Sequence, residues 1–257
     1  MILKAPTSGE ITVLGLDPSK ERGKLFHQAG VQLQETVHQN DARVWELCSL
    51  FAAMYPDPLD YKKLLQQFHL QKKAASPLSK LSSGQRQRAA LILALIGNPK
   101  PLFLDELTTG LDPQSRREIW NYLQELQSEG RTIVLTTHYM EEAAFLCDQI
   151  CLINHGRIIA QGTVEQVIEQ AQIDLTITLQ SEAPILPFLE GLPYISRSTQ
   201  AGSQVSISTS SEQTLADLVL RLREHNLDYR RMTISYPELE DAFLRLIKTE
   251  AEKRVSS

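Results

Sequence analysis

Charged residues that could do chemistry follow two predicted strands. Asp105 and Glu106 come directly after the apolar residues 101–104, and His138 follows the apolar run 132–135. In an open parallel sheet, ligands bind beyond the carboxyl ends of the strands. A first carboxylate there can hold a hard cation, and a second can activate a water molecule. The Asp-Glu pair alone could equally well cap the following loop, but His138 at the next strand end favours a reactive site.

Small polar residues open a predicted helix shortly before these strands. Residues 82–84 (SSG) precede a segment whose apolar positions repeat at helical spacing, until Asn98-Pro99 stops it. Backbone amides at a helix N-terminus, favoured by the helix dipole, make an anion site. An ordinary N-cap explains the same residues, and taken alone it is the better explanation.

Strands and helices alternate around these residues. Asp112-Pro113 is an N-cap with proline at the first helical position, and Gly130 ends that helix. The run 132–135 is a near-continuous apolar strand of the kind that is buried in a parallel sheet. This order predicts an α/β domain with a mostly parallel sheet. The other expected elements are strands at 10–14, 101–104, 150–154 and 157–160 and a helix at 140–147.

The composition shifts after residue 171, which predicts a second, smaller domain. Its expected order is βαββαβ, a split-βαβ, ferredoxin-like arrangement, followed by a closing helix. The two domains are therefore expected at 1–171 and 172–257. The expected strands of the second domain are 175–179, 194–198, 204–209 and 229–235, and its expected helices are 185–189, 215–224 and 238–248.

The composition excludes several classes of protein. The 257 residues are 42% hydrophobic and 22% charged, with a net charge of −5, which excludes a disordered or low-complexity chain. The sequence has no long basic run, no apolar run near the ~18 residues of a membrane span and no signal peptide. We therefore expect a soluble, intracellular protein. Its three cysteines, Cys48, Cys147 and Cys151, are expected to be buried in a reducing compartment.

Taken together, these residues resemble the sequence motifs of ABC-type ATPases. Residues 81–88 (LSSGQRQR) are similar to the signature motif LSGGQ followed by xQR, and residues 102–106 (LFLDE) resemble the Walker B strand. The nearest branch is the ATPases of drug, lipid and polysaccharide exporters, whose small C-terminal domain often ends in a segment similar to residues 237–243. The family's D-loop resembles residues 109–112, and its switch-histidine motif resembles residues 136–138. Its Q-loop glutamine resembles Gln34, and the segment after its phosphate-binding helix resembles residues 6–11. The resemblance covers residues 6–165.

The resemblance implies a role for each matched residue. Asp105 would hold Mg²⁺, Glu106 would polarise the attacking water, and His138 would contact the γ-phosphate of ATP. Gln34 would sense the metal ion, take part in catalysis and link the site to a membrane partner. Across a head-to-tail dimer, the nucleotide would be contacted by Ser82, Ser83, Gly84 and Gln85. Asp112 would lie at the dimer interface.

One motif of the family is not found in the 257 residues. The phosphate-binding loop GxxxxGK[ST] supplies backbone amides and a lysine to the phosphates. The only Gly-Lys pair is Gly23-Lys24, and Pro18 and Leu25 occupy positions that would need glycine and serine or threonine. We therefore expect an ATPase domain without its N-terminal strand, P-loop and helix, and an isolated chain that is inactive. Two smaller differences from the family motifs are Ser83, where the signature motif has glycine, and Leu107, where a proline usually follows the catalytic glutamate.

The function implied is that of an ATP-binding and ATP-hydrolysing subunit of an ABC transporter, which couples hydrolysis to export through a separate permease. Such a subunit would form a homo- or heterodimer at the cytoplasmic face of the cell membrane, without nucleic acid, and the permease would dock on residues 36–70. The alternative is a non-hydrolytic partner that lends its signature motif to a complete ATPase subunit. A third hypothesis, a soluble ABC protein acting on DNA or ribosomes, would need coiled coils, tandem cassettes or basic surfaces that the sequence does not have.

Overall fold

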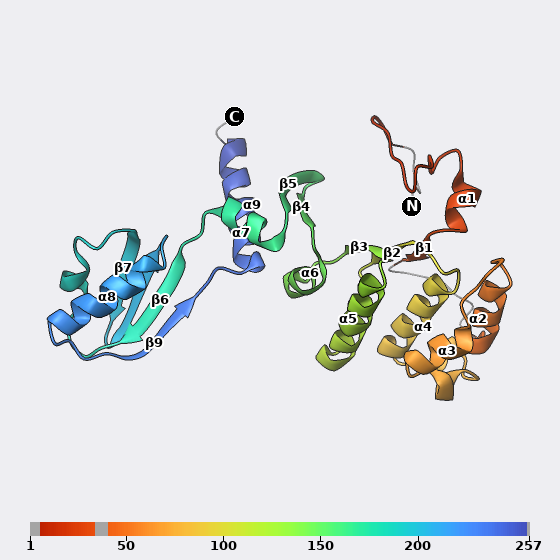
Figure 1. Cartoon of the computed structure of the whole chain (residues 1–257), viewed down its shortest axis with the longest axis horizontal. Coiled ribbons are helices and arrows are strands. Elements are labelled where there is room, and N and C mark those ends of the chain that lie inside the picture. The colour runs from red at the N-terminus through yellow and green to blue at the C-terminus, as the bar shows by residue number, and fades with distance from the viewer. Residues whose placement is uncertain (1–5, 34–40, 256–257) are drawn as a thin grey trace. The chain divides into compact units, whose positions relative to one another are not determined.

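The computed structural model describes residues 6–33 and 41–255. The chain divides into two compact units, Met1–Leu146 and Cys147–Ser257. Each unit has its own sheet and its own helices (Figure 1). The division falls before the boundary expected at 171/172, because the segment after Leu146 clusters with the C-terminal part of the chain.

A parallel three-stranded sheet forms the centre of the first unit. Strand β2 (Pro101–Asp105) lies between β1 (Gly30–Gln32) and β3 (Thr132–Thr136). The expectation of a parallel α/β sheet is therefore confirmed. Asp105 pairs with Thr136 in the β2–β3 register, so the carboxyl ends of these two strands meet at one edge of the sheet.

Two helices with strong N-terminal signals pack beside this sheet (Figure 1). Helix α4 (Ser83–Leu95) begins after Ser82, and α5 (Pro113–Ser128) begins after Asp112. Buried aliphatic and aromatic side chains fill the space between these helices and the strands. These are Leu91, Ile92 and Leu95 of α4, Leu102 and Leu104 of β2, and Ile119 and Trp120 of α5.

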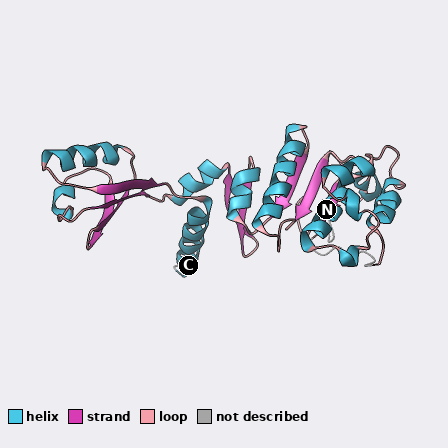
Figure 2. Cartoon of the chain, turned by 90° about the horizontal axis from the view of Figure 1, so that it is seen from below, coloured by secondary structure: helices cyan, strands magenta, loops and turns pink. Residues whose placement is uncertain are grey.

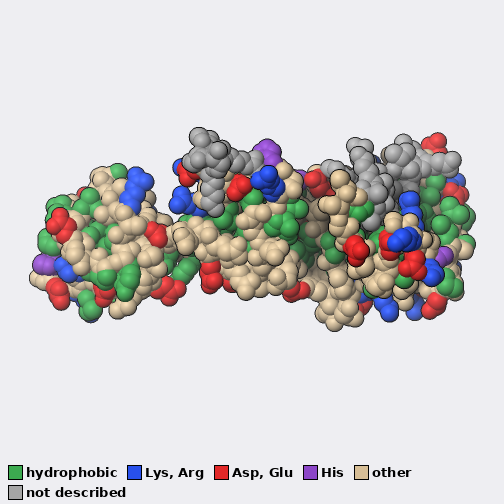
Figure 3. Space-filling model, turned by 90° about the horizontal axis from the view of Figure 1, so that it is seen from above, with side chains coloured by type: hydrophobic (Ala, Val, Ile, Leu, Met, Phe, Trp, Pro, Cys, Tyr) green, Lys and Arg blue, Asp and Glu red, His purple; other side chains and the backbone are tan. Residues whose placement is uncertain are grey.

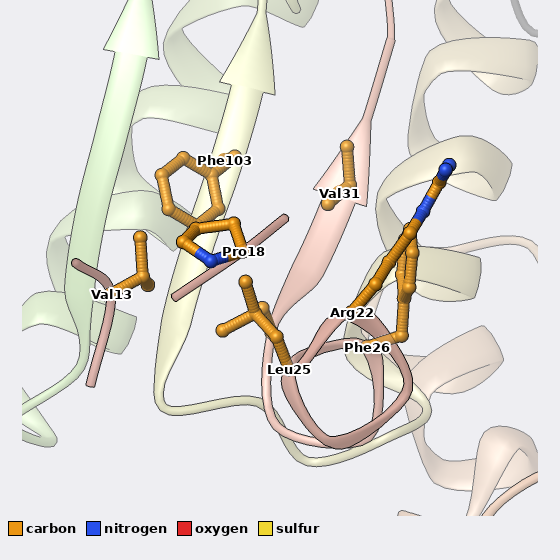
Figure 4. A pocket seen from close by; sticks show the side chains of 8 residues that line it. Val13, Pro18, Arg22, Leu25, Phe26, Val31 and Phe103 are labelled. Carbon is orange, nitrogen blue, oxygen red and sulfur yellow. The ribbon is translucent and has the colours of Figure 1, made fainter. Parts of the chain in front are cut away.

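Short helices complete the first unit. They are α1 (Arg22–Phe26), α2 (Val44–Ala52), α3 (Tyr61–Gln67), the 3-10 turns η1 (Gln71–Lys73) and η2 (Leu78–Lys80), and α6 (Met140–Leu146). Gly23 and Lys24 lie within α1, where the Lys24 ammonium is 2.9 Å from the Glu21 carboxylate. In Figure 4, Val13, Pro18 and Leu25 gather in front of Val31 of β1 and Phe103 of β2, so that the segment before α1 covers part of this sheet face.

The strand expected at 10–14 is wrong. Val13 and Leu16 form only an isolated bridge, whose two backbone hydrogen bonds are 3.0 and 2.9 Å long. Leu14 and Gly15 between them both have positive φ, 53° and 74°. Two successive left-handed residues reverse the chain in a tight turn, and the alternating residues of this segment therefore do not extend into a strand.

The second unit contains a hairpin, several helices and a four-stranded antiparallel sheet (Figure 2). The hairpin is β4 (Ile150–Asn154) with β5 (Arg157–Gly162), and helices α7 (Val164–Ala171) and α9 (Leu239–Val255) pack together. The sheet has the order β7-β8-β6-β9, where β6 is Leu175–Gln180, β7 is Ile195–Ala201, β8 is Gln204–Thr209 and β9 is Arg230–Ser235.

One apolar core holds this sheet against helix α8 (Gln213–Glu224) and the 3-10 turn η3 (Leu186–Leu189). Ile177, Val205 and Leu218 are fully buried in it. The element order follows the expected βαββαβ pattern, except that η3 is a short 3-10 turn where a helix was expected at 185–189.

Three observations bear on the expectations from composition. Cys48 is buried, but Cys147 is half-buried and Cys151 is exposed, so the expectation of three buried cysteines is wrong for Cys151, which points outward from β4. On the face drawn in Figure 3, acidic and basic side chains are scattered among each other. Within residues 6–33 and 41–255, none of the helices has both the length and the apolar character needed to cross a membrane.

Candidate active site

The adjacent ends of β2 and β3 bring three of the predicted site residues together. Asp105 closes β2, and its Oδ1 accepts a hydrogen bond from the Thr136 hydroxyl of β3. His138 Nδ1 lies 3.6 Å from Glu106 Oε1. The side chains of His138 and Glu106 are 53% and 29% exposed, so a small ligand in solution can reach both. The structure therefore places a carboxylate pair and an imidazole at one edge of the sheet.

Glu106 has an unusual backbone conformation. Its φ is +47°, in the left-handed region that residues other than glycine seldom occupy. Its N–H donates to the Thr136 carbonyl at 3.0 Å, and its Oε2 accepts from the Thr109 hydroxyl at 3.3 Å. Left-handed residues of this kind cluster at functional sites, where the surrounding structure holds them. In this conformation the Glu106 carboxylate lies 3.6 Å from His138 Nδ1.

The residues of the predicted signature motif form the N-terminus of α4. Ser82 Oγ accepts the N–H of Gln85 at 3.3 Å, and Gln85 Oε1 accepts the N–H of Ser82 at 3.2 Å. This reciprocal pair is a capping box, as in the simpler of the two interpretations of these residues. Ser82 and Ser83 are exposed, whereas Gly84 is buried. The Ser82 hydroxyl oxygen takes part in this cap, and both serines lie exposed at the positive end of the helix dipole.

Gly84 allows α4 to approach the start of α5. A Cβ atom at this position would lie 3.3 Å from Ser115 Oγ, which is tighter than an ordinary van der Waals contact. Asp112 caps α5 by accepting the N–H of Ser115 at 3.0 Å. That backbone hydrogen bond favours the ionised carboxylate and lowers the pKa of Asp112 below its ordinary value. Gln34, the remaining predicted site residue, lies outside the described residues.

Sequence reasoning missed two buried polar side chains behind the strand ends. Gln32, at the end of β1, is 3% exposed. Its Oε1 accepts the N–H of Asp105 at 3.3 Å, and its Nε2 donates to the Leu33 carbonyl at 2.8 Å. The amide thus joins the end of β1 to the start of the acidic pair. A glutamine within an apolar strand was the available signal, since an unpaired amide would not be buried there.

The second missed residue is Glu142 of α6, which is also 3% exposed. Its Oε1 accepts hydrogen bonds from the Thr108 hydroxyl and the Trp120 indole. Two adjacent glutamates, Glu141 and Glu142, begin the predicted helix 140–147, and the sequence alone does not tell which of them turns inward.

The residues at the strand ends fit a divalent cation that is shared with a phosphate ligand. Mg²⁺ prefers oxygen ligands and is usually held by one or two carboxylates together with substrate phosphates and water. Asp105 supplies a carboxylate at the sheet edge. In the part of the chain that the structure describes, no group of three or more His, Cys, Asp or Glu side chains is arranged to hold a metal ion. Asp105 could therefore be one carboxylate ligand of a metal ion that is also bound by a phosphate.

A groove of about 330 Å³ lies between α1, β1, α2 and α4. Gln32 lines it beside the aromatic rings of Phe51 and Tyr55. Met54, which also lines it, is 60% exposed, and Leu50 on α2 is 59% exposed. The groove and these side chains form an apolar surface within the first unit, at the end of β1.

Known proteins resemble the chain over most of its length. "Nod factor export ATP-binding protein I" of Rhizobium sp. (strain N33) is 34% identical, with 98% of this chain and 83% of the relative covered. The protein of the same name from Sinorhizobium fredii is 35% identical, with 96% and 72% covered. A family model described as "AAA domain, putative AbiEii toxin, Type IV TA system" matches residues 20–142. A solved structure titled "Structure of ATP binding subunit of ABC transporter" is 25% identical with a TM-score of 0.58, and covers 64% of this chain and 71% of its own.

Proposed function

The chain belongs to the family of ABC transporter ATP-binding subunits, and from that membership we propose that it hydrolyses ATP to drive export through a separate permease. The observation that carries the proposal is the pair formed by Glu106 and His138, 3.6 Å apart, with Asp105 at the preceding position. A general base, an imidazole and a carboxylate that would hold a metal ion are three of the groups that take part in the hydrolysis of a phosphoanhydride.

In the proposed reaction, Glu106 takes a proton from the water that attacks the γ-phosphorus. The bond from the γ-phosphorus to the bridging oxygen breaks as the new bond to the water oxygen forms. With Nδ1 facing Glu106, His138 directs Nε2 at a γ-phosphate oxygen. Mg²⁺, when bound, supplies charge neutralisation to the phosphates, and Asp105 would hold it, with Gln34 as the second residue assigned to it.

The proposal assigns nucleotide contacts to the N-termini of α4 and α5. Ser82, Ser83, Gly84 and Gln85 would face the γ-phosphate held by the other subunit of a homo- or heterodimer, and Asp112 would lie at that interface. The exposure of Ser82 and Ser83 and the helix dipole of α4 support this assignment. In the same proposal, residues 1–171 form the ATPase domain and residues 172–257 form a ferredoxin-like domain.

A permease would dock on the apolar groove beside α2. The groove volume of about 330 Å³ and the exposed side chains of Leu50 and Met54 suit a short amphipathic segment. This partner would hold the subunit at the cytoplasmic face of the membrane. The curated relatives are named for Nod factor export, and we extend only the direction of transport from that name to this chain.

A second candidate function rests on a specific observation. The 257 residues contain no GxxxxGK[ST] pattern, and the single Gly-Lys pair lies inside α1. A chain with these features could act as a non-hydrolytic partner, whose signature residues complete the nucleotide site of another ATPase subunit.

One experiment separates the two candidates. We would measure ATP hydrolysis by the chain, alone and with a P-loop-bearing ABC ATPase subunit, for Glu106→Gln and for Ser82→Arg. If this chain hydrolyses ATP, Glu106→Gln lowers kcat by about 100-fold or more, because the general base is lost. If it only lends its signature motif, Ser82→Arg abolishes the activity of the mixture and Glu106→Gln leaves it unchanged. Glu141→Gln, at an exposed neighbouring helix position, is the control and should change neither.

A further inference from the structure

A buried carboxylate lies behind the candidate active site. Glu142 Oε1 accepts the Thr108 hydroxyl at 2.7 Å and the Trp120 indole N–H at 2.8 Å. All three residues are nearly inaccessible, with 3%, 1% and 1% of their surface exposed. Glutamates are rarely buried to this extent unless they are paired, because desolvation of the carboxylate costs free energy. The short hydrogen bonds therefore fix the positions of the groups that make them.

The partners of Glu142 belong to the segments that carry Glu106 and His138. Thr108 is two residues after Glu106, and the hydroxyl of the next residue, Thr109, donates to Glu106 Oε2. Glu142 itself is four residues after His138, in the first turn of α6. A single carboxylate oxygen thus connects the loop after β2 to the helix that follows β3.

We propose that Glu142, acting through Thr108, is the positioning residue that sets the Glu106–His138 pair. Glu106 occupies a left-handed conformation, which persists only where neighbouring contacts hold it. The Thr108–Glu142 hydrogen bond ties the loop that follows Glu106 to helix α6. This helix begins two residues after His138. The expected effect on ATP hydrolysis rests on the proposed function, whereas the positioning of Glu106 and His138 does not depend on it.

A second contact holds the histidine from α5. The Arg116 guanidinium lies 4.1 Å from the centre of the Tyr139 ring, and that ring lies 4.2 Å from the His138 ring. Trp120 of the same helix donates to Glu142. Helix α5 therefore contacts the chain just before α6, at Tyr139, and also within α6, at Glu142. The hydrogen bond from Thr108 to Glu142 restrains the loop after Glu106.

The test uses the full chain without nucleotide or partner. Thr108→Val removes the hydroxyl and keeps the side-chain shape, and Thr108→Ser restores the hydroxyl. In the valine variant we expect the ¹H–¹³C signals of the His138 imidazole to shift, and in the serine variant to return to their wild-type positions. His155 and His225 lie in the second unit, and their signals serve as the internal control. Unchanged His138 signals in Thr108→Val, or an equal shift in Thr108→Ser, would overturn the proposal.

Hydrogen exchange separates a local effect from a loss of overall stability. With one hydrogen bond lost, the amides of Glu106 and Thr109 should exchange about fivefold faster in Thr108→Val. Amides of Leu91 and Leu95 in α4 should exchange at the wild-type rate. Equal acceleration in α4 would mean that the hydrogen bond serves only global stability, and would overturn the proposal.

The matching change at the other partner is Glu142→Gln, whose amide oxygen can accept both hydrogen bonds. We expect it to keep the wild-type His138 signals, whereas Glu142→Ala shifts them as Thr108→Val does; a glutamine variant that behaves like alanine contradicts the positioning role. In an active assembly, Thr108→Val should lower kcat about tenfold at unchanged KM. An assembly without ATPase activity would refute the proposed function and leave the imidazole result to decide the positioning.

Discussion

At the scale of single residues, Asp112 shows how a backbone N–H group holds a carboxylate of the candidate site. The Ser115 N–H at 3.0 Å both caps α5 and stabilises the carboxylate. A cap of this kind links protonation to folding, since only the ionised form gains fully from the helix N-terminus.

Asp112 should therefore contribute stability that depends on pH. Its pKa in the folded chain lies below the ordinary value of 3.8, so the contribution is present above that value and is lost as the pH falls through the lower folded pKa. We expect the Tm of wild type to exceed that of Asp112→Asn at pH 7, and the difference to shrink below about pH 4. Thermal unfolding followed by circular dichroism at pH 7 and pH 3 measures both values.

The matched variant for this prediction is Asp112→Ala. Asparagine still accepts the Ser115 N–H, but alanine does not. The alanine variant should have the lower Tm of the two at both pH values. A Tm difference between wild type and Asp112→Asn that is the same at pH 7 and pH 3 would contradict the linkage.

Sequence reasoning named candidate residues that the structure brings together at the strand ends, but it did not name the two buried polar residues behind them. Asp105, Glu106 and His138 were predictable because charged residues directly follow apolar strands, and parallel neighbours bring such ends together. Gln32 and Glu142 were not predictable, because their burial depends on partners that are distant in sequence, such as Asp105 for Gln32 and Thr108 for Glu142. The left-handed backbone of Glu106 also has no local signal, since glutamate has no preference for it.

At the scale of elements, capping residues predicted α4 and α5 well, and most strands were found, but the three-residue strand β1 was missed and a strand was wrongly expected at 10–14. Helices α4 and α5 begin at the residues that Ser82 and Asp112-Pro113 indicate. Strand β1 is only three residues long, which is too short for a hydrophobic period to be recognised. It forms because pairing with β2 supplies backbone hydrogen bonds that no local pattern reveals.

Strand β1 depends on a close approach at its first residue. A Cβ atom on Gly30 would lie 2.4 Å from the Ala94 carbonyl oxygen and 2.8 Å from atoms of Leu102 and Pro99. Gly30→Ala should therefore lower the free energy of unfolding by about 1–3 kcal/mol through overpacking. Because Gln32 binds Asp105 from the same strand, the displaced strand should also disturb the acidic pair. Chemical denaturation measures the change in stability.

Gly23→Ala is the matched control for this substitution. Gly23 lies in helix α1, and a Cβ atom there meets nothing within 4 Å. Alanine is favoured over glycine in a helix by about 1 kcal/mol, so this variant should be unchanged or slightly more stable. Equal stability of Gly30→Ala and wild type would show that β1 can shift without cost.

At the scale of the whole molecule, the chain consists of two units with separate cores. The boundary predicted from composition followed the change at residue 171, but β4, β5 and α7 cluster with the C-terminal sheet, and α7 packs against α9. Composition does not register this packing, because α9 follows α7 by more than sixty residues in the sequence. Units that each bury their own apolar residues are expected to unfold as separate cooperative transitions.

Helix α8 offers a test of this independence. Leu218 is fully buried in the core of the C-terminal sheet, whereas Leu220, two residues later on the same helix, is 59% exposed. Leu218→Ala should destabilise the second unit by about 2–5 kcal/mol, because it leaves a cavity in a closed core. Leu220→Ala should change stability by less than about 0.5 kcal/mol. In differential scanning calorimetry, Leu218→Ala should lower the temperature of one transition and leave the other in place, because α8 belongs to the second unit alone. A single transition that moves as a whole in Leu218→Ala would mean that the two units fold as one cooperative body.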